Sequence, residues 1–316
     1  MFKHRSDGIF EKTADPILGM TSHLMPRRYD AMVNFKLEAR CEPMDEYIKK
    51  TYEEKGIHFS YMEILIAAIV RMYAERPFLN RFVMNGRVFR RKDIYISFAV
   101  KKQLIDDAPE TTVKVKFTGE ENIFEIKKII DDIILQNKGD AANNDTDDTA
   151  KILTRIPNWL TKAVVGILMW MDRHNCMPKK IIEVSPFHTS CFLTNMKSIS
   201  TDYVYHHLYD FGTTGLFVGL GKEHMEPVVN PETKQIEPGK IVKMGLVIDE
   251  RICDGFYYAK AIKVAKKYLL NPALLEQNYK IPFKDKVLSG KELRARKKEK
   301  KRLLKIQKRM AKQKNN

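Results

Sequence analysis

Residues Lys240–Leu275 read KIVKMGLVIDERICDGFYYAKAIKVAKKYLLNPALL, and this stretch decides the fold. Its first part is rich in β-branched and apolar residues, which predicts a largely buried strand over Ile241–Ile248. After Asp254-Gly255 the apolar residues recur every three or four positions, as in a helix, until Asn271-Pro272 ends the pattern. The stretch therefore predicts a strand, a polar corner and a helix.

Helical and strand patterns interleave along the rest of the chain. A capping box at Ser60–Glu63 predicts the start of one helix, and Asn85-Gly86 predicts a two-residue hairpin turn. Interleaved elements of this kind indicate an α/β layer fold. Further helices are predicted over 43–55, 123–135 and 159–171, and further strands over 31–40, 94–100, 113–117, 181–194 and 215–220.

Charge separates the chain into a body and a tail. The net charge is +16, but residues 291–316 hold thirteen Lys or Arg against two Glu, a net +11 that leaves +5 for the other 290 residues. We expect an irregular N-terminal arm (1–20), one body domain (21–280) with a mobile loop at 138–150, and a basic tail (281–316). The tail is either a solvated segment or a contact for an anionic partner, such as RNA, an acidic protein or lipid.

The sequence also predicts where the protein works. No apolar run reaches the ~18 to 20 residues of a membrane helix, and the first residues lack the apolar core of a secretory signal. The cysteines have no paired metal-ligand spacing, so we expect no metal site. Reduced thiols in a cytoplasmic protein are the simplest interpretation of these cysteines, which are Cys41, Cys176, Cys191 and Cys253.

The polar corner resembles a known motif. Glu250–Gly255 (ERICDG) is similar to the His-x-x-x-Asp-Gly corner of the coenzyme A-dependent acyltransferases, which include chloramphenicol acetyltransferase and the catalytic domains of dihydrolipoamide acyltransferases. The similarity extends over roughly Thr21–Leu275. It implies a two-layer α/β sandwich, with a mixed sheet and helices on one face. It also implies a homotrimer with active sites between subunits.

The resemblance further implies a reaction. An acyl group would pass from acyl-CoA, the expected substrate, to a thiol or hydroxyl through a tetrahedral intermediate, without a covalently bound cofactor. Glu250 would stand at the position of the general-base histidine, and Thr194 would donate a hydrogen bond to the oxyanion. A glutamate in water has a pKa near 4.3, so Glu250 needs a pKa-raising environment to act as the base. Alternatively, Glu250 pairs with Arg251 or Arg27 and the protein is an inactive trimeric scaffold or ligand-binding protein.

Asp254 has two expected roles. Its position predicts a cap for the helix that begins at Gly255, because an Asp oxygen accepts free backbone N–H groups there. The resemblance implies an ion pair between Asp254 and either Arg27 or Arg28. Residues expected to line the substrate channel are Asn195, His206, His207 and Gly255.

Overall fold

The computed structural model describes residues 5–11, 15–101, 110–138, 157–230, 233–282 and 298. The chain divides into two compact units, Met1–Ile281 and Pro282–Asn316. The loop predicted at 138–150 lies outside the described residues beyond the helix end at Lys138, and so does most of the predicted basic tail.

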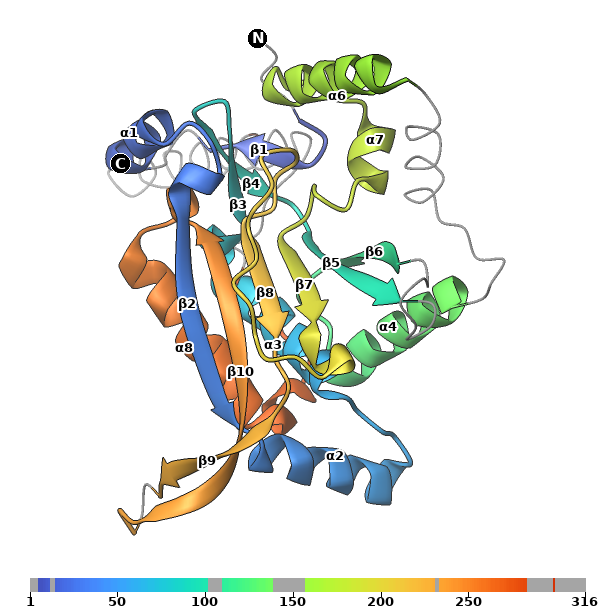
Figure 1. Cartoon of the computed structure of the whole chain (residues 1–316), viewed down its shortest axis with the longest axis vertical. Helices are drawn as coiled ribbons and strands as arrows, with labels where there is room; N and C mark the ends of the chain where they lie inside the picture. Colours follow the sequence, from blue (N-terminus) through green and yellow to red (C-terminus); the bar gives the residue numbers. More distant parts are fainter. Residues whose placement is uncertain are drawn as a thin grey trace, which may run out of the picture. The chain divides into compact units, whose positions relative to one another are not determined.

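A mixed seven-stranded sheet forms the first layer of the body (Figure 1). Its strand order is β2-β10-β8-β7-β5-β6, with β9 paired to β10 outside this path. β7 runs parallel to both β5 and β8, and the other pairs are antiparallel. The strands are β2 (Met32–Arg40), β5 (Ile94–Lys101), β6 (Glu110–Phe117), β7 (Cys191–Asn195), β8 (Leu216–Leu220), β9 (His224–Val229) and β10 (Ile236–Asp249).

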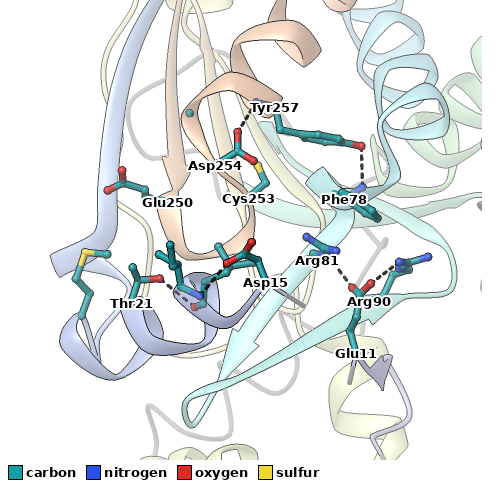
Figure 2. A pocket seen from close by; sticks show the side chains of 14 residues that line it. Glu11, Asp15, Thr21, Phe78, Arg81, Arg90, Glu250, Cys253, Asp254 and Tyr257 are labelled. Atoms are coloured by element: carbon teal, nitrogen blue, oxygen red, sulfur yellow. Dashed lines mark hydrogen bonds and ion pairs between the residues drawn. The ribbon is translucent and has the colours of Figure 1, made fainter. Parts of the chain in front are cut away.

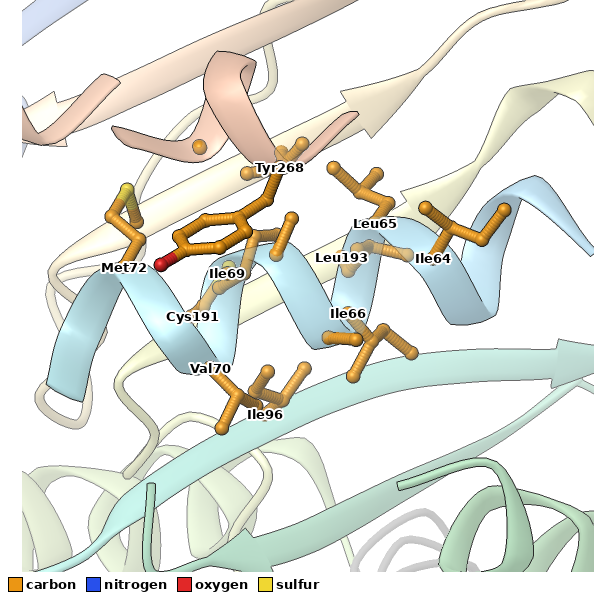
Figure 3. Close-up of a cluster of buried hydrophobic side chains, with 14 of the residues drawn as sticks. Ile64, Leu65, Ile66, Ile69, Val70, Met72, Ile96, Cys191, Leu193 and Tyr268 are labelled. Carbon is orange, nitrogen blue, oxygen red and sulfur yellow. The ribbon is translucent and has the colours of Figure 1, made fainter. Parts of the chain in front are cut away.

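Helices cover one face of this sheet, as the resemblance implied. The central one is α3 (Tyr61–Glu75), which starts at the predicted capping box and buries thirteen of its fifteen residues. It lies between the sheet and the other helices, so most of its circumference is apolar (Figure 3). Its buried charged residues are Glu63 and Arg71. Packed in the same core are α2 (Glu42–Lys55), α4 (Ile123–Lys138) and α8 (Gly255–Leu270).

An extended segment, residues 201–214, crosses the opposite face of the sheet. Gly219 and Gly245 let it lie flat, because a Cβ on either glycine would meet the Val204 carbonyl oxygen at 2.7 or 2.3 Å. Leu208 of this segment then packs with Phe217 and Val247 in a small second cluster. Side chains on both faces of β8 are therefore buried, as expected for a strand that is covered on both sides.

Two predicted segments differ from the structure. The arm predicted to be irregular contains β1 (Gly8–Phe10) and α1 (Pro16–Leu24), and β1 joins β4 (Arg87–Arg91) and β3 (Arg81–Met84) in a second, three-stranded sheet. A three-residue edge strand is too short to show alternation in the sequence. The strand predicted at 181–194 is wrong in its first part, which forms the short helix α7 (Lys179–Val184). α6 (Asn158–Arg173) precedes it.

Candidate functional site

A pocket of about 720 Å³ opens at the corner between β10 and α8 (Figure 2). Glu250 begins a short 3-10 helix (Glu250–Ile252) directly after the last residue of β10, and its exposed side chain lines the pocket. Asp254 and Gly255 line it as well, and α1 contributes Thr21. Three of the residues predicted for the site therefore share one cavity.

Asp254 caps α8, as its position predicted. Its Oδ1 accepts a hydrogen bond from the Tyr257 N–H at 2.8 Å, and its side chain is otherwise exposed. Gly255 is the first residue of the helix. The corner is thus held by a local helix cap rather than by a buried ion pair at Asp254.

The predicted pairing of Asp254 with Arg27 or Arg28 is wrong. Arg28 is buried and lies 3.5 Å from Asp249, the residue before the motif, while Arg27 is exposed with its guanidinium over the Tyr29 ring. Asp249 also binds Arg251 through both carboxylate oxygens, at 2.8 Å each. Asp249 points inward at the end of the strand, whereas Asp254 lies at the surface. The buried arginines, Arg28 and Arg251, therefore pair with Asp249 and not with Asp254.

These contacts also remove the expected structural partners of Glu250. Arg251 is engaged by Asp249, and Arg27 by Tyr29. Within the part of the chain that the structure describes, the Glu250 carboxylate makes no hydrogen bond or ion pair. An exposed, unpartnered carboxylate on a cavity wall is open to a ligand.

The far wall of the pocket carries a charged cluster that the sequence did not predict. Glu11 accepts from Arg81 at 2.7 Å and from Arg90, and its side chain is only 8% exposed (Figure 2). Burial alone would raise the pKa of Glu11, but the two guanidinium hydrogen bonds outweigh it and hold the pKa below its usual value. Arg81 is the first residue of β3, directly after the Pro77–Asn80 turn. Glu11 reaches Arg81 only through the tertiary fold, because the two residues are 70 positions apart in the sequence.

Cys253 also lines the pocket, but its thiol is not suited to attack a substrate. Burial raises the pKa of Cys253 to about 12, with the nearby Asp254 adding to the shift. The thiolate is the nucleophilic form, so this cysteine stays protonated and unreactive near neutral pH. Glu250 is left as the chemically available group at the corner.

The predicted oxyanion residues lie away from the Glu250 corner, at the carboxyl end of β7. Thr194 pairs with Gly219 of β8, and Gly219 pairs with Gly245 of β10, five residues before Glu250. Strand rise and spacing then separate Thr194 from Glu250 by roughly 19 Å. Asn195 donates to Met62 Sδ at 3.7 Å, and its buried Oδ1 has no hydrogen-bond partner among the described residues. One copy of the chain does not bring Thr194 to Glu250.

The two histidines predicted for the channel lie on the sheet face opposite the helices. His206 stacks on Phe217 with ring centroids 4.2 Å apart, and burial lowers its pKa, so it is neutral near pH 7. His207 is exposed beside it, with ring centroids 4.6 Å apart. Neither ring lines the pocket at Glu250.

Among the described residues, no three His, Cys, Asp or Glu side chains gather as metal ligands would. In the same part of the chain, no helix has the length and apolar character needed to cross a bilayer.

Comparison with known proteins defines the architecture. The model of the family 2-oxoacid dehydrogenases acyltransferase (catalytic domain) matches residues 215–276, which include the corner. The dihydrolipoamide acetyltransferase of Azotobacter vinelandii is 14% identical, with a TM-score of 0.52, and the match covers 82% of this chain and 88% of that one. The chain has the acyltransferase fold. The resemblance predicted from the corner is confirmed at this level.

Two further solved structures share this fold. The cubic core of a pyruvate dehydrogenase multienzyme complex is 14% identical with a TM-score of 0.51, covering 84% of this chain and 93% of that one. Chloramphenicol acetyltransferase is 10% identical with a TM-score of 0.51, covering 83% and 99%. Comparison with curated protein sequences found no match.

Proposed function

We propose that this acyltransferase-fold protein transfers an acyl group from an acyl-CoA thioester to a thiol or hydroxyl acceptor in the pocket at Glu250. The observation that carries the proposal is the unpartnered Glu250 carboxylate on the wall of a 720 Å³ cavity, at the corner matched by the acyltransferase family model. The Azotobacter enzyme has a histidine and an asparagine, four positions apart, whose catalytic role has been investigated. Glu250 and Asp254 have the same separation.

The chemistry requires one base and one oxyanion donor. Glu250 accepts the acceptor's proton as the sulfur or oxygen attacks the thioester carbonyl carbon, and the carbonyl electron pair moves onto oxygen. The Thr194 hydroxyl donates a hydrogen bond to that oxyanion. When the intermediate collapses, the C–S bond breaks, the CoA sulfur leaves, and it takes the proton back from Glu250.

A second copy of the chain would supply Thr194. The distance of roughly 19 Å between Thr194 and Glu250 within one sheet is too large for both to act on one carbonyl group. In a homotrimer, Glu250 of one subunit could face Thr194 of the next, as the family resemblance implies. This chain shares its fold with the cubic core of a pyruvate dehydrogenase multienzyme complex, which supports the proposal that copies of this chain assemble.

Mixed trimers test this arrangement. Thr194→Ala and Glu250→Gln are each expected to lower the rate of CoA thiol release from acetyl-CoA with a small thiol acceptor by about 10² or more. Co-expressed with different tags and purified as hetero-trimers, the two variants should regain about a third of the wild-type sites, because each hetero-trimer has one interface of its three with an intact Glu250 facing an intact Thr194. No recovery in verified hetero-trimers would contradict a shared site.

A second candidate function is a non-catalytic trimer that binds an acyl-CoA-like ligand. It is favoured by the exposed carboxylate at the position where the resemblance implies an imidazole, since a carboxylate is a weak base near neutral pH. Glu250→His separates the two. A catalytically competent pocket should gain acyl transfer or thioester hydrolysis from the imidazole. A folded variant that binds CoA but gains no activity would favour the binding protein.

A further inference from the structure

Helix α6 (Asn158–Arg173) is an apolar helix that the body leaves largely uncovered. Of its sixteen residues only Asp172 is buried. Trp159, Ile167 and Trp170 are 70%, 58% and 57% exposed. Together with Ala163 they recur at intervals of four, four and three residues, so they form one line along the helix, here called the tryptophan stripe. The stripe holds both tryptophans of the chain.

The stripe is not what fixes α6 to the body. The helix is held at its C-terminal end, where Asp172 Oδ1 accepts from Arg5 Nη2 at 2.7 Å and Oδ2 lies 3.2 Å from His188 Nε2. Arg5 also donates to the Asp172 carbonyl and to Asn175 Oδ1. α7 lies next in the chain (Figure 1). A buried polar anchor therefore presents an exposed apolar stripe that the fold does not require.

Charges beside the stripe indicate what covers it. Lys162 and Arg173 each lie three residues after a tryptophan, and both are exposed, so every tryptophan has a cation one turn along the helix. Arg173 also lies 3.9 Å from Asp210, a half-exposed contact that a lipid phosphate would have to compete with. Lys179, which pairs with Glu183 at 3.1 Å, and Lys180 follow at the start of α7. Indole rings beside long cationic side chains are typical of helices that lie in a membrane interface, where the rings enter the headgroup layer and the cations reach lipid phosphates.

We propose that α6 is a membrane-surface helix that docks the protein on an anionic bilayer. It would lie in the plane of the membrane, with the tryptophan stripe in the interfacial layer and Lys162 and Arg173 at the phosphates. Residues 1–290 carry a net charge of +5, which favours an anionic surface. This proposal is independent of the chemistry at Glu250.

The two tryptophans make the test direct. Full-length protein is mixed with vesicles of phosphatidylcholine and phosphatidylglycerol in equal parts, and both tryptophan emission and co-sedimentation are recorded. We expect a blue shift of the emission, because both indoles leave water, and binding that weakens as salt rises. Vesicles of phosphatidylcholine alone should give little of either. An equal response to both compositions would overturn the anionic docking.

A matched pair of variants locates the contact. Ile167→Glu places a charge in the stripe, whereas Val165→Glu places the same charge on the far side of the same helix, at a residue that is 39% exposed. Ile167→Glu should bind at least about tenfold more weakly than Val165→Glu, because it removes an inserted isoleucine and adds an anion. Both should melt like the wild type.

Three results would overturn the proposal. Sedimentation without a blue shift would assign membrane binding to the basic tail, which has no tryptophan. A blue shift that grows with protein concentration in the absence of vesicles would make the stripe a contact between copies of the chain. Equal vesicle binding by the two glutamate variants would remove α6 from the contact.

Discussion

Asp249 and Glu250 follow one another at the end of β10, yet Asp249 is 1% exposed between two arginines, while Glu250 lines a pocket and its carboxylate has no partner among the residues that the structure describes. Two other carboxylates of the cavity differ in the same way. Glu11, on the far wall, pairs with Arg81 and Arg90, whereas Asp254, on the same wall as Glu250, only caps a helix. Carboxylates turned inward hold elements together, and those turned outward are available to a ligand. Stability and activity should therefore respond to different members of this set.

The largest effect is expected from Asp249→Ala. It leaves the buried guanidiniums of Arg28 and Arg251 without their carboxylate, and breaking a buried pair on one side costs about 3–5 kcal/mol. The free energy of unfolding, measured by denaturant titration, should fall by that amount. An unchanged denaturation midpoint would show that Asp249 does not stabilise the fold, and would contradict the difference inferred between Asp249 and Glu250.

Glu11→Gln should have the next largest effect, about 1–3 kcal/mol, because hydrogen bonds to Arg81 and Arg90 are lost or weakened. The effect should depend on pH. The pKa of Glu11 is lowered in the folded state, so its contribution is present above the unfolded value of about 4.3 and is lost as pH falls through the folded value. The stability difference between wild type and variant should shrink in acid. A difference that is constant from pH 7 to pH 3 would contradict this assignment.

Asp254→Ala should cost only about 1 kcal/mol, the loss of a helix cap, instead of the 3–5 kcal/mol of a buried pair. Asp254→Asn is the matched control, because asparagine caps equally well and should restore the unfolding midpoint. A loss as large as that of Asp249→Ala would mean that Asp254 has a buried partner in the assembled protein.

The smallest change in stability is expected from Glu250→Gln. The side chain is exposed and unpartnered among the described residues, so the free energy of unfolding should move by no more than about 0.5 kcal/mol. Thermal melts of the variant and the wild type should overlay. A clear destabilisation would show that Glu250 holds the corner together, and would weaken its assignment to chemistry.

The sequence predicted the architecture of this corner better than its electrostatics. The strand over Ile241–Ile248, the cap at Asp254 and the helix from Gly255 follow from local patterns, and all are present. The pairing of Arg28 with Asp249 was missed because three acids lie within six residues, and local patterns do not tell which of them turns inward. The cluster at Glu11 was missed for a related reason, since only tertiary contacts bring residue 11 to Arg81.

Local sequence patterns also did not reveal how the proposed reaction residues are placed relative to one another. Glu250, Asp254 and Gly255 share a pocket because they are neighbours in sequence. Thr194 and Asn195 end a strand parallel to β8 and antiparallel to β10 across it, so they lie level with Gly245 and Met244 and not with Glu250. Strand direction is a property of topology, so the motif alone does not reveal that a site containing both groups needs a second copy of the chain.

Calorimetric titration of acetyl-CoA into the wild type tests the central claim most directly, namely that the outward carboxylates line an acyl-CoA pocket. The account predicts saturable binding that persists at moderate salt and is lost in Glu250→Trp, whose indole would fill the cavity at an exposed position. Heat that disappears as salt rises, and that is the same in Glu250→Trp, would contradict it, because such binding would belong to the basic tail.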